Sequence, residues 1–319
     1  MERNVLGIDI GGTKIAVIYA KEKDGIELVD KVTFPTTQVD DTIHGIFTRV
    51  QELMEKHGLN EGNTHAIGIS CGGPLSSERG VVMSPPNLPG WDHIPIVDLI
   101  KERFHIPCGL QNDANACALA EWKFGAGKGT KNMIFLTFGT GMGAGLILNG
   151  QLYTGVNDNA GEVGHIRLAP FGPVGYGKAG SFEGFASGGG IAQLAKTKLM
   201  EKFQMGETVN WCSREELDAV SAQTVALNAG KGDPLALEII RISGGFLGLG
   251  LAVLIDILNP ECIVIGSIYS RNEALFYPLI EEVLQKEALG LARQVCQIKP
   301  AELGEHIGDY AAVSIAANM

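Results

Sequence analysis

The chain has 319 residues, of which 45% are apolar and 19% are charged, and its formal net charge is -11. Because this length exceeds what one hydrophobic core usually organises, we expect two domains with a cleft between them. The negative charge argues against a sequence-independent grip on nucleic acid or on an anionic membrane, since both need basic patches. The composition therefore favours a folded protein with a small-molecule ligand.

The cysteine spacing and the apolar runs indicate a cellular compartment. The six cysteines are scattered without CxxC spacing, so we expect them to be reduced. Only a short apolar run precedes Asp9, and the longest apolar stretch, Phe246 to Ile255, is short and rich in glycine. We therefore expect no signal peptide, no transmembrane helix and a cytoplasmic location.

The first strands form a pattern that occurs twice. Val5 to Ile10 and Ile15 to Ala20 are apolar runs on either side of two glycines, which predicts a hairpin. Met133 to Phe138 and Ala144 to Leu148 repeat this arrangement around a second glycine turn. Such a repeat predicts two related halves, each with an equivalent loop, that could hold one ligand from opposite sides.

The rest of the chain alternates between strands and helices. Apolar periodicity predicts helices at Asp41–His57, Ala114–Phe124, Gly188–Phe203, Ser213–Ala229, Pro234–Leu258 and Phe276–Ala288. Apolar runs predict strands at Ala66–Ser70, Cys108–Leu110 and Cys262–Ile265. Phe171 to Ser181 contains four glycines and a proline, which predicts a loop. The alternation predicts an α/β fold.

The first glycine turn has parts that suit a magnesium-bound triphosphate. In Asp9-Ile10-Gly11-Gly12-Thr13-Lys14, a carboxylate ends a strand, glycines let the backbone approach a polyanion, and a hydroxyl and an ammonium follow. An ordinary hairpin turn is the alternative interpretation of this motif. The second turn, from Phe138 to Gly143, favours the phosphate loop.

Competing motifs fail on their context. No GxxxxGK[ST] string occurs, and no GxGxxG follows a strand, which disfavours a P-loop protein and a nicotinamide dehydrogenase. The string from Gly68 to Gly72 matches GxSxG, with Ser70 as the nucleophile of a hydrolase. That motif requires a helix directly after the serine, whereas Gly72-Gly73-Pro74 resists one. A hydrolase is therefore disfavoured.

Polar residues at other loops offer candidate groups for catalysis and for binding a polyol. Asn112 and Asp113 stand where a strand gives way to a helix, so either could cap that helix. Alternatively, Asp113 could accept the proton of an attacking hydroxyl. The segments from Ala160 to His165 and from Ser181 to Glu183 add acceptors and one imidazole near glycine loops.

Seven motifs in order resemble the ROK family of sugar kinases and repressors: LGIDIGGTKIAV, GGPL, NLPGW, NDANACALAEW, GTGMGAGLILNG, NAGEVGH and FEGFASG. The resemblance implies the actin-like ATPase (ribonuclease H-like) fold, with two α/β domains around a cleft. It implies a small domain over 1–118 plus a last helix at about 305–319, and a larger domain over 119–304 with the sugar loop and the dimer-forming helices. It also implies ATP, Mg²⁺, a hexose 6-phosphate product and a homodimer.

Family positions carry over residue by residue. The resemblance implies Asp113 as the catalytic base and Asp9 as a magnesium ligand through water. The implied nucleotide residues are Asp9, Gly11, Gly12, Thr13, Lys14, Thr137, Gly139, Thr140, Gly141, Gly143 and Gly266. The implied sugar residues are Gly73, Asn87, Asn112, Asp113, Glu162, His165 and Glu183.

Two departures from the family pattern affect these expectations. Many members bind zinc with a histidine and three cysteines, but here the cysteine positions are Val174, Tyr176 and Ser181. One imidazole cannot complete a tetrahedral site, so we expect no zinc, and we expect packing by Phe171, Tyr176 and Phe182 to order this loop instead. The second departure follows Gly266, where members commonly have a longer glycine run near the adenosine.

The substrate and the catalytic role have open alternatives. Glucose is the first choice by resemblance, and fructose, mannose, N-acetylglucosamine and N-acetylmannosamine are alternatives that differ by single groups. A repressor of the family would carry a helix-turn-helix domain ahead of the kinase-like part. The first predicted strand begins four residues into this chain, so we expect no such domain and no nucleic-acid partner. A non-catalytic sugar-binding regulator is the remaining alternative.

Overall fold

A computed structural model describes residues 2–319, which divide into two compact units. Unit 1 comprises residues 2–131, 145–160 and 302–319, and unit 2 comprises residues 132–144 and 161–301. The division that we expect near residue 118 falls inside the continuous helix α3 (Asp113–Phe124), which belongs to unit 1.

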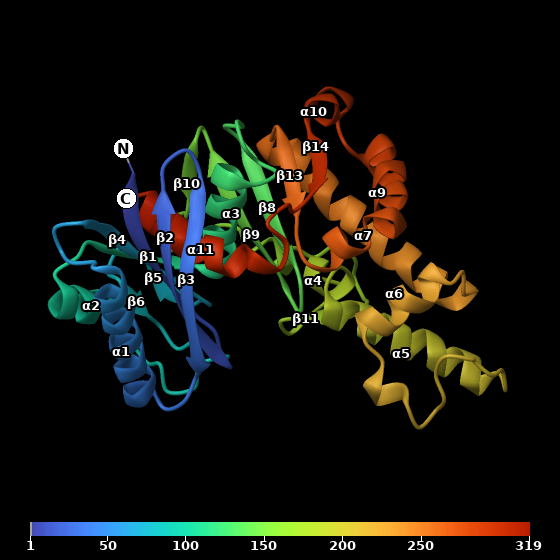
Figure 1. The fold of residues 1–319 in the computed structure, drawn as a ribbon. Helices are drawn as coiled ribbons and strands as arrows, with labels where there is room; N and C mark the ends of the chain where they lie inside the picture. The colour runs from blue at the N-terminus through green and yellow to red at the C-terminus, as the bar shows by residue number, and fades with distance from the viewer. Residues whose placement is uncertain (1) are drawn as a thin grey trace. The chain divides into compact units, whose positions relative to one another are not determined.

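Unit 1 contains a five-stranded sheet with the strand order β3-β2-β1-β4-β7 (Figure 1). Its strands are β1 (Arg3–Ile10), β2 (Lys14–Glu22), β3 (Ile26–Pro35), β4 (Thr64–Cys71) and β7 (Cys108–Asn112). Strands β1, β4 and β7 are parallel, whereas β2 and β3 are antiparallel to their neighbours. A short hairpin of β5 (Leu75–Ser76) and β6 (Val81–Val82) follows β4.

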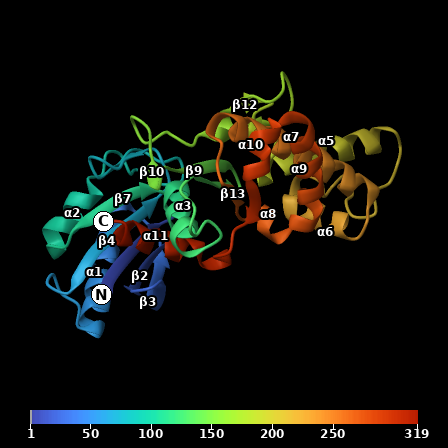
Figure 2. The same ribbon diagram turned by 90° about the horizontal axis from the view of Figure 1, so that it is seen from above.

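Helices cover both faces of this sheet, because side chains along each strand alternate between two cores. One face packs Leu6, Ile8 and Ile10 with residues of α1 (Val39–His57) and α2 (Ile96–Phe104). The other face packs Val5 against α11 (Ile307–Ala317), near the end of the chain (Figure 2). Glycine is required there: a Cβ on Gly68 would lie 2.2 Å from the backbone oxygen of Ala312.

The second five-stranded sheet has the order β10-β9-β8-β13-β14. Its strands are β8 (Met133–Phe138), β9 (Met142–Leu148), β10 (Gln151–Tyr153), β13 (Cys262–Ile265) and β14 (Gln297–Pro300). A small hairpin pairs β11 (Val174–Gly175) with β12 (Lys178–Ala179). The unit 2 helices are α4 (Phe182–Phe185), α5 (Gly188–Gln204), α6 (Ala222–Gly230), α7 (Pro234–Leu258), α8 (Ile268–Arg271), α9 (Glu273–Glu287) and α10 (Gly290–Val295). Short 3₁₀ turns occupy η1 (Val163–His165), η2 (Leu217–Ala219) and η3 (Gly304–His306).

The structure confirms both hairpins and the α/β alternation, and it corrects one helix. The helix predicted over Ser213–Ala229 is wrong in its first half, which holds only the turn η2. Helix α6 begins after Ser221, whose hydroxyl caps the helix by accepting from the N–H of Thr224. Serine at that position stops the helix from extending further back.

Helix α7 has the length and the apolar composition of a membrane span, unlike any other helix within residues 2–319. In unit 2, 61% of its most apolar window is buried. It packs against α5, α6 and α9, as the central helix of a folded core does (Figure 2). Burial inside the protein thus accounts for its composition.

Candidate functional site

Three loops of unit 1 meet at one edge of the sheet because β1, β4 and β7 are parallel. Ile10 pairs in register with Cys71, and Cys71 pairs in register with Asn112. The residues after each strand, Gly11, Gly72 and Asp113, therefore emerge at the same edge. Ligands of α/β sheets bind outside the carboxyl ends of such strands.

Glycines let these loops approach each other closely. A Cβ on Gly12 would lie 2.5 Å from the backbone oxygen of Asn87, and a Cβ on Gly72 would lie 3.3 Å from its Oδ1. A Cβ on Gly73 would lie 3.2 Å from Nδ2 of Asn112. The predicted residues Gly12, Gly73, Asn87 and Asn112 are thus gathered in one place. Thr13 and Lys14 are exposed beside them in the β1–β2 turn.

Asn112 and Asp113 both form hydrogen bonds at the start of α3. Oδ1 of Asn112 accepts from the N–H of Ala114 at 2.9 Å, so Asn112 is the N-cap of α3. Asp113 is the first residue of α3, and its Oδ1 accepts from the same N–H at 2.9 Å. Asp113 is exposed to solvent. A hydroxyl group can therefore reach the Asp113 carboxylate.

Negative charge accumulates around Asp9. Burial first, and then the neighbouring carboxylate of Asp113, raise the pKa of Asp9 to about 6, and Asp309 adds to this effect. The hydroxyl of Ser70 and the ammonium of Lys31 act in the opposite direction. Lys31 also forms a salt bridge with the buried Asp309 at 2.6 Å. Desolvation by surrounding protein raises the pKa of Asp113, and backbone N–H groups partly oppose it.

A divalent cation is suited to this cluster, since it would stabilise the charged carboxylates. Within residues 2–319, no three acidic, histidine or cysteine side chains are placed to hold a metal ion by themselves. Magnesium commonly keeps several waters and binds through one or two carboxylates and substrate phosphates. The residues present therefore fit a magnesium ion near Asp9.

The second glycine turn in unit 2 is held by its own backbone and by two neighbours. The Thr137 hydroxyl accepts from the N–H of Gly143 at 2.8 Å, and Gly139 donates its N–H to the oxygen of Gly141 at 3.1 Å. The N–H of Gly188, at the start of α5, donates to the oxygen of Gly139 at 2.7 Å. Gly266 extends from β13 beside this turn, donating its N–H to Leu136. The loop thus lies at the positive end of α5.

The segment that carries Glu162 and His165 packs on the same turn. A Cβ on Gly161 would lie 2.0 Å from the oxygen of Ala144, and Gly161 has a φ of 92°, so only glycine fits here. A Cβ on Gly164 would lie 2.3 Å from the oxygen of Met142. Glu162 and His165 are exposed to solvent.

Glu183 connects the predicted sugar loop to the second glycine turn. Its Oε2 accepts from the N–H of Met142 at 3.0 Å. A Cβ on Gly141 would lie 2.8 Å from the same oxygen, so glycine leaves room for the carboxylate. The predicted residues Thr137, Gly139, Gly141, Gly143 and Glu183 are thus packed together within unit 2.

The loop that would carry zinc cysteines is ordered differently from our expectation. Phe182 is completely buried, as expected, and a Cβ on Gly250 of α7 would lie 2.3 Å from its ring. Phe171 is 78% exposed, so packing by its ring is the wrong explanation. Tyr176 is 80% exposed, but its ring meets that of His165 edge-on, with the ring centroids 6.2 Å apart. The side chains of Phe171 and Tyr176 both lie on the outside of the loop. Hydrogen bonds hold the β11–β12 hairpin instead.

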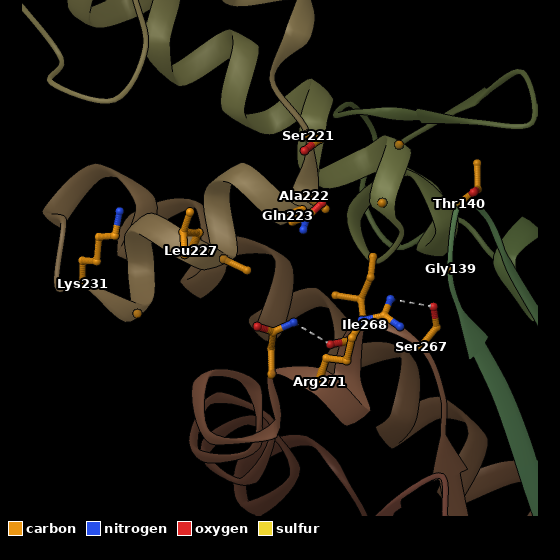
Figure 3. A pocket seen from close by; sticks show the side chains of 15 residues that line it. Gly139, Thr140, Ser221, Ala222, Gln223, Leu227, Lys231, Ser267, Ile268 and Arg271 are labelled. Carbon is orange, nitrogen blue, oxygen red and sulfur yellow. Dashed lines mark hydrogen bonds between the residues drawn. The ribbon is translucent and has the colours of Figure 1, made fainter. Parts of the chain in front are cut away.

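A cavity of about 920 Å³ opens beside the second glycine turn, entirely within unit 2 (Figure 3). Gly139, Thr140 and the first glycines of α5 form one end, and α6 and α8 form the sides. Leu227 and Ile268 supply apolar surface, whereas Arg271 and Lys231 supply positive charge. Its volume is in the range of ligand pockets. An apolar wall next to a helix N-terminus suits a base with attached phosphates.

Apart from Gly139 and Thr140 of the glycine turn, the lining residues of this cavity were not predicted from the sequence. Small residues at Ala222, Ala226 and Gly230 recur every four positions and face the cavity. This spacing was the available signal, because it leaves space on one helix face. The sequence reasoning correctly disfavoured Ser70 as a nucleophile, since Ser70 lies inside β4 and is only 2% exposed.

The fold and these loops define a class of protein. Two five-stranded sheets with their helices, each with a glycine loop at a strand end, form the actin-like ATPase fold of the solved sugar kinases. A model described as "ROK family" matches residues 5–318, so this chain belongs to the ROK family.

Relatives of two kinds are similar to the chain. A glucokinase of Halalkalibacterium halodurans is 33% identical, covering 96% of this chain and 93% of the glucokinase. The crystal structure of a ROK family glucokinase from Streptomyces griseus, in complex with glucose and AMPPNP, is 29% identical with a TM-score of 0.77. It covers 99% of this chain and 100% of that one. The DNA-binding transcriptional dual regulator NagC of Escherichia coli is 30% identical, covering 86% of this chain and 66% of the regulator.

Proposed function

We propose that this protein is an ATP-dependent hexose kinase that converts glucose to glucose 6-phosphate, with Asp113 as the general base. The observation that carries the proposal is the meeting of three loops at one sheet edge. There, Asp113 is exposed beside two asparagines and a glycine loop. Its carboxylate lies close enough to Asp9 to raise the pKa of Asp9. The similarity to glucokinases over nearly the whole chain supports this proposal.

The reaction needs one proton acceptor and a positioned phosphoryl donor. The oxygen of the sugar hydroxyl attacks the γ-phosphorus, forming an O–P bond, while the bond between that phosphorus and ADP breaks. Asp113 accepts the hydroxyl proton on a carboxylate oxygen. A raised pKa makes this carboxylate a better base than an ordinary aspartate, provided that it stays ionised at the working pH.

The two glycine loops and the cavity are proposed to bind the phosphoryl donor, ATP. The loop of Gly11, Gly12, Thr13 and Lys14 and the loop of Thr137, Gly139, Thr140, Gly141 and Gly143 are proposed to hold the phosphates. The base and ribose are proposed to occupy the cavity beside Gly266, between α6 and α8. Magnesium, when bound near Asp9, neutralises charge on the phosphate oxygens. Because transfer of a phosphoryl group is largely a matter of positioning, these loops, each with a backbone hydrogen bond of its own, suit the task.

The sugar contacts are proposed at Gly73, Asn87, Asn112, Asp113, Glu162, His165 and Glu183. Amide and carboxylate groups can donate to and accept from the hydroxyls of a hexose. Fructose, mannose and the N-acetylated hexosamines present similar hydroxyls, so they are the alternative substrates. We further propose a cytoplasmic homodimer that needs no zinc.

A sugar-responsive regulator is the second candidate, because NagC aligns with most of this chain. Asp113 separates the two candidates experimentally. Asp113→Asn keeps the size of the side chain but loses the proton acceptor. We expect kcat to fall by about 10²- to 10⁴-fold, while glucose affinity measured by calorimetry changes by less than about fivefold.

An Asn112→Ala variant is the control, since it removes the neighbouring cap and leaves the base. We expect Asn112→Ala to weaken stability and sugar binding more than the chemical step. An Asp113→Asn variant that phosphorylates glucose at the wild-type rate would remove Asp113 from its proposed role.

A further inference from the structure

We infer that Gln193 of α5 is a positioning residue for sugar binding, because its amide holds the hairpin that supports Glu183. This inference rests on the proposed function, in which Glu183 and His165 contact the sugar. Within unit 2, Oε1 of Gln193 accepts from the N–H of Val174 at 2.9 Å. Its Nε2 donates to the oxygen of the same residue at 2.8 Å.

The hairpin geometry explains why Val174 needs this partner. Tyr176 and Gly177 form a two-residue turn, with φ angles of 44° and 74°. Gly175 and Lys178 flank this turn, and Val174 pairs with Ala179 one step further out. In an antiparallel ladder, hydrogen-bonded pairs alternate with pairs whose N–H and C=O groups point outwards. Val174 is in the outward-pointing pair, so the Gln193 amide takes the place of a neighbouring strand.

Other contacts tie the opposite side of the hairpin to the segment of His165. Nζ of Lys178 donates to the backbone oxygen of His165 at 2.7 Å. A guanidinium nitrogen of Arg167 donates to the oxygen of Ala179 at 2.6 Å. The hairpin is therefore held by side chains from both directions, with Gln193 as its anchor to a long helix.

The β11–β12 hairpin packs directly against the backbone that carries Glu183. A Cβ on Gly175 would lie 2.7 Å from the N of Gly184 and 2.8 Å from the Cβ of Glu183. A Cβ on Gly184 would lie 2.3 Å from the oxygen of Pro173. With so little space, a shift of β11 moves Glu183, whose carboxylate also meets the Met142 N–H of the second glycine turn.

Three variants test this inference. Gln193→Ala removes both hydrogen bonds with Val174. Gln193→Glu keeps an acceptor for the N–H of Val174, but it places a carboxylate oxygen against the carbonyl oxygen of Val174. Gln204→Ala, at the exposed end of the same helix, is the matched control. The two readouts are hydrogen–deuterium exchange of residues 165–183 in the ligand-free protein, and steady-state kinetics with the hexose and with ATP.

We expect both Gln193 variants to exchange faster over residues 165–183. We expect KM for the hexose to rise about 10-fold, while kcat stays within about twofold, because the lost hydrogen bonds order the loop of Glu183 and leave Asp113 in place. Gln204→Ala should match the wild type. Unchanged exchange, or faster exchange with an unchanged hexose KM, would overturn the inference.

The result also separates this inference from the proposed function. If the wild-type protein phosphorylates no hexose, the kinase proposal fails. The equilibrium dissociation constant for the hexose then replaces KM in the comparison. A 10-fold weaker affinity in Gln193→Ala would still support the positioning role, and an unchanged affinity would overturn it.

Discussion

The carboxylate of Asp9 lowers the stability of the fold at neutral pH. Its carboxylate lies near Asp113 and Asp309, and burial with these neighbours raises its pKa from the usual 3.8 to about 6. The folded state therefore binds this proton more tightly than the unfolded chain does. The charged form of Asp9 destabilises the fold above pH 6, and protonation relieves this effect as the pH falls towards 4.

Asp9→Asn should consequently stabilise the protein in buffer without nucleotide or metal. We expect the free energy of unfolding at pH 7.5 to increase by roughly 1 to 3 kcal/mol, with little difference from the wild type near pH 4. Urea unfolding at several pH values measures this. Asp24→Asn in the exposed turn between β2 and β3 is the control. Equal stability of Asp9→Asn and wild type at both pH values would contradict the electrostatic account.

Single residues also mark where sequence reasoning was ambiguous. From the sequence, Asn112 or Asp113 could cap the helix, and Asp113 could instead be a catalytic base. Both interpretations remained open because both residues stand at the start of the same helix. The structure assigns the cap to Asn112 through the hydrogen bond with Ala114. Gly161 and Gly164 could not be explained from the sequence, because the strand oxygens that exclude a Cβ belong to β9, distant in the chain.

At the scale of elements, Glu121 connects α3 to the segment that enters α11. This buried carboxylate accepts from the N–H of Ala126 at 2.8 Å, of Glu302 at 3.3 Å and of Leu303 at 3.0 Å. Three backbone donors compensate for the removal of one charge from water. The contact orders the last helix of unit 1.

Glu121→Gln should destabilise the protein, because an NH₂ group replaces one of the accepting oxygens and faces an N–H donor. We expect a loss of about 1 to 3 kcal/mol in the free energy of unfolding, measured by urea titration. Glu102→Gln on the exposed face of α2 should cost less than about 0.5 kcal/mol. Equal midpoints for the two variants would show that Glu121 has no such bridging role.

Elements with strong local signals were predictable from the sequence. The bounds of α7 and β13 match their predictions, because both are long or continuous apolar runs between turns. Strand β3 was not predicted, since its side chains alternate between partly buried and exposed positions and carry several charges. The hairpin of β11 and β12 was predicted only as a loop, because its partner Gln193 comes from a separate helix.

At the scale of the molecule, the sequence repeat corresponds to two glycine loops, one in each unit. The loop of Gly12 lies beside Asn87 in unit 1, and the loop of Gly141 lies beside Glu183 in unit 2. The resemblance predicted the family and the fold. The family match over residues 5–318 confirms the family, and the similarity to solved sugar kinases confirms the fold. The choice of sugar was not predictable, because it depends on small differences in the placement of polar groups.

The most direct test of the central claim is ADP release with Mg-ATP across glucose, fructose, mannose, N-acetylglucosamine and N-acetylmannosamine. The purified protein is first treated with a chelator and then resupplied with magnesium alone. We predict sugar-dependent ADP release that is highest with glucose and needs no added zinc. Glucose binding by calorimetry without ADP release from any of these sugars would contradict the account and establish a non-catalytic sugar-binding protein.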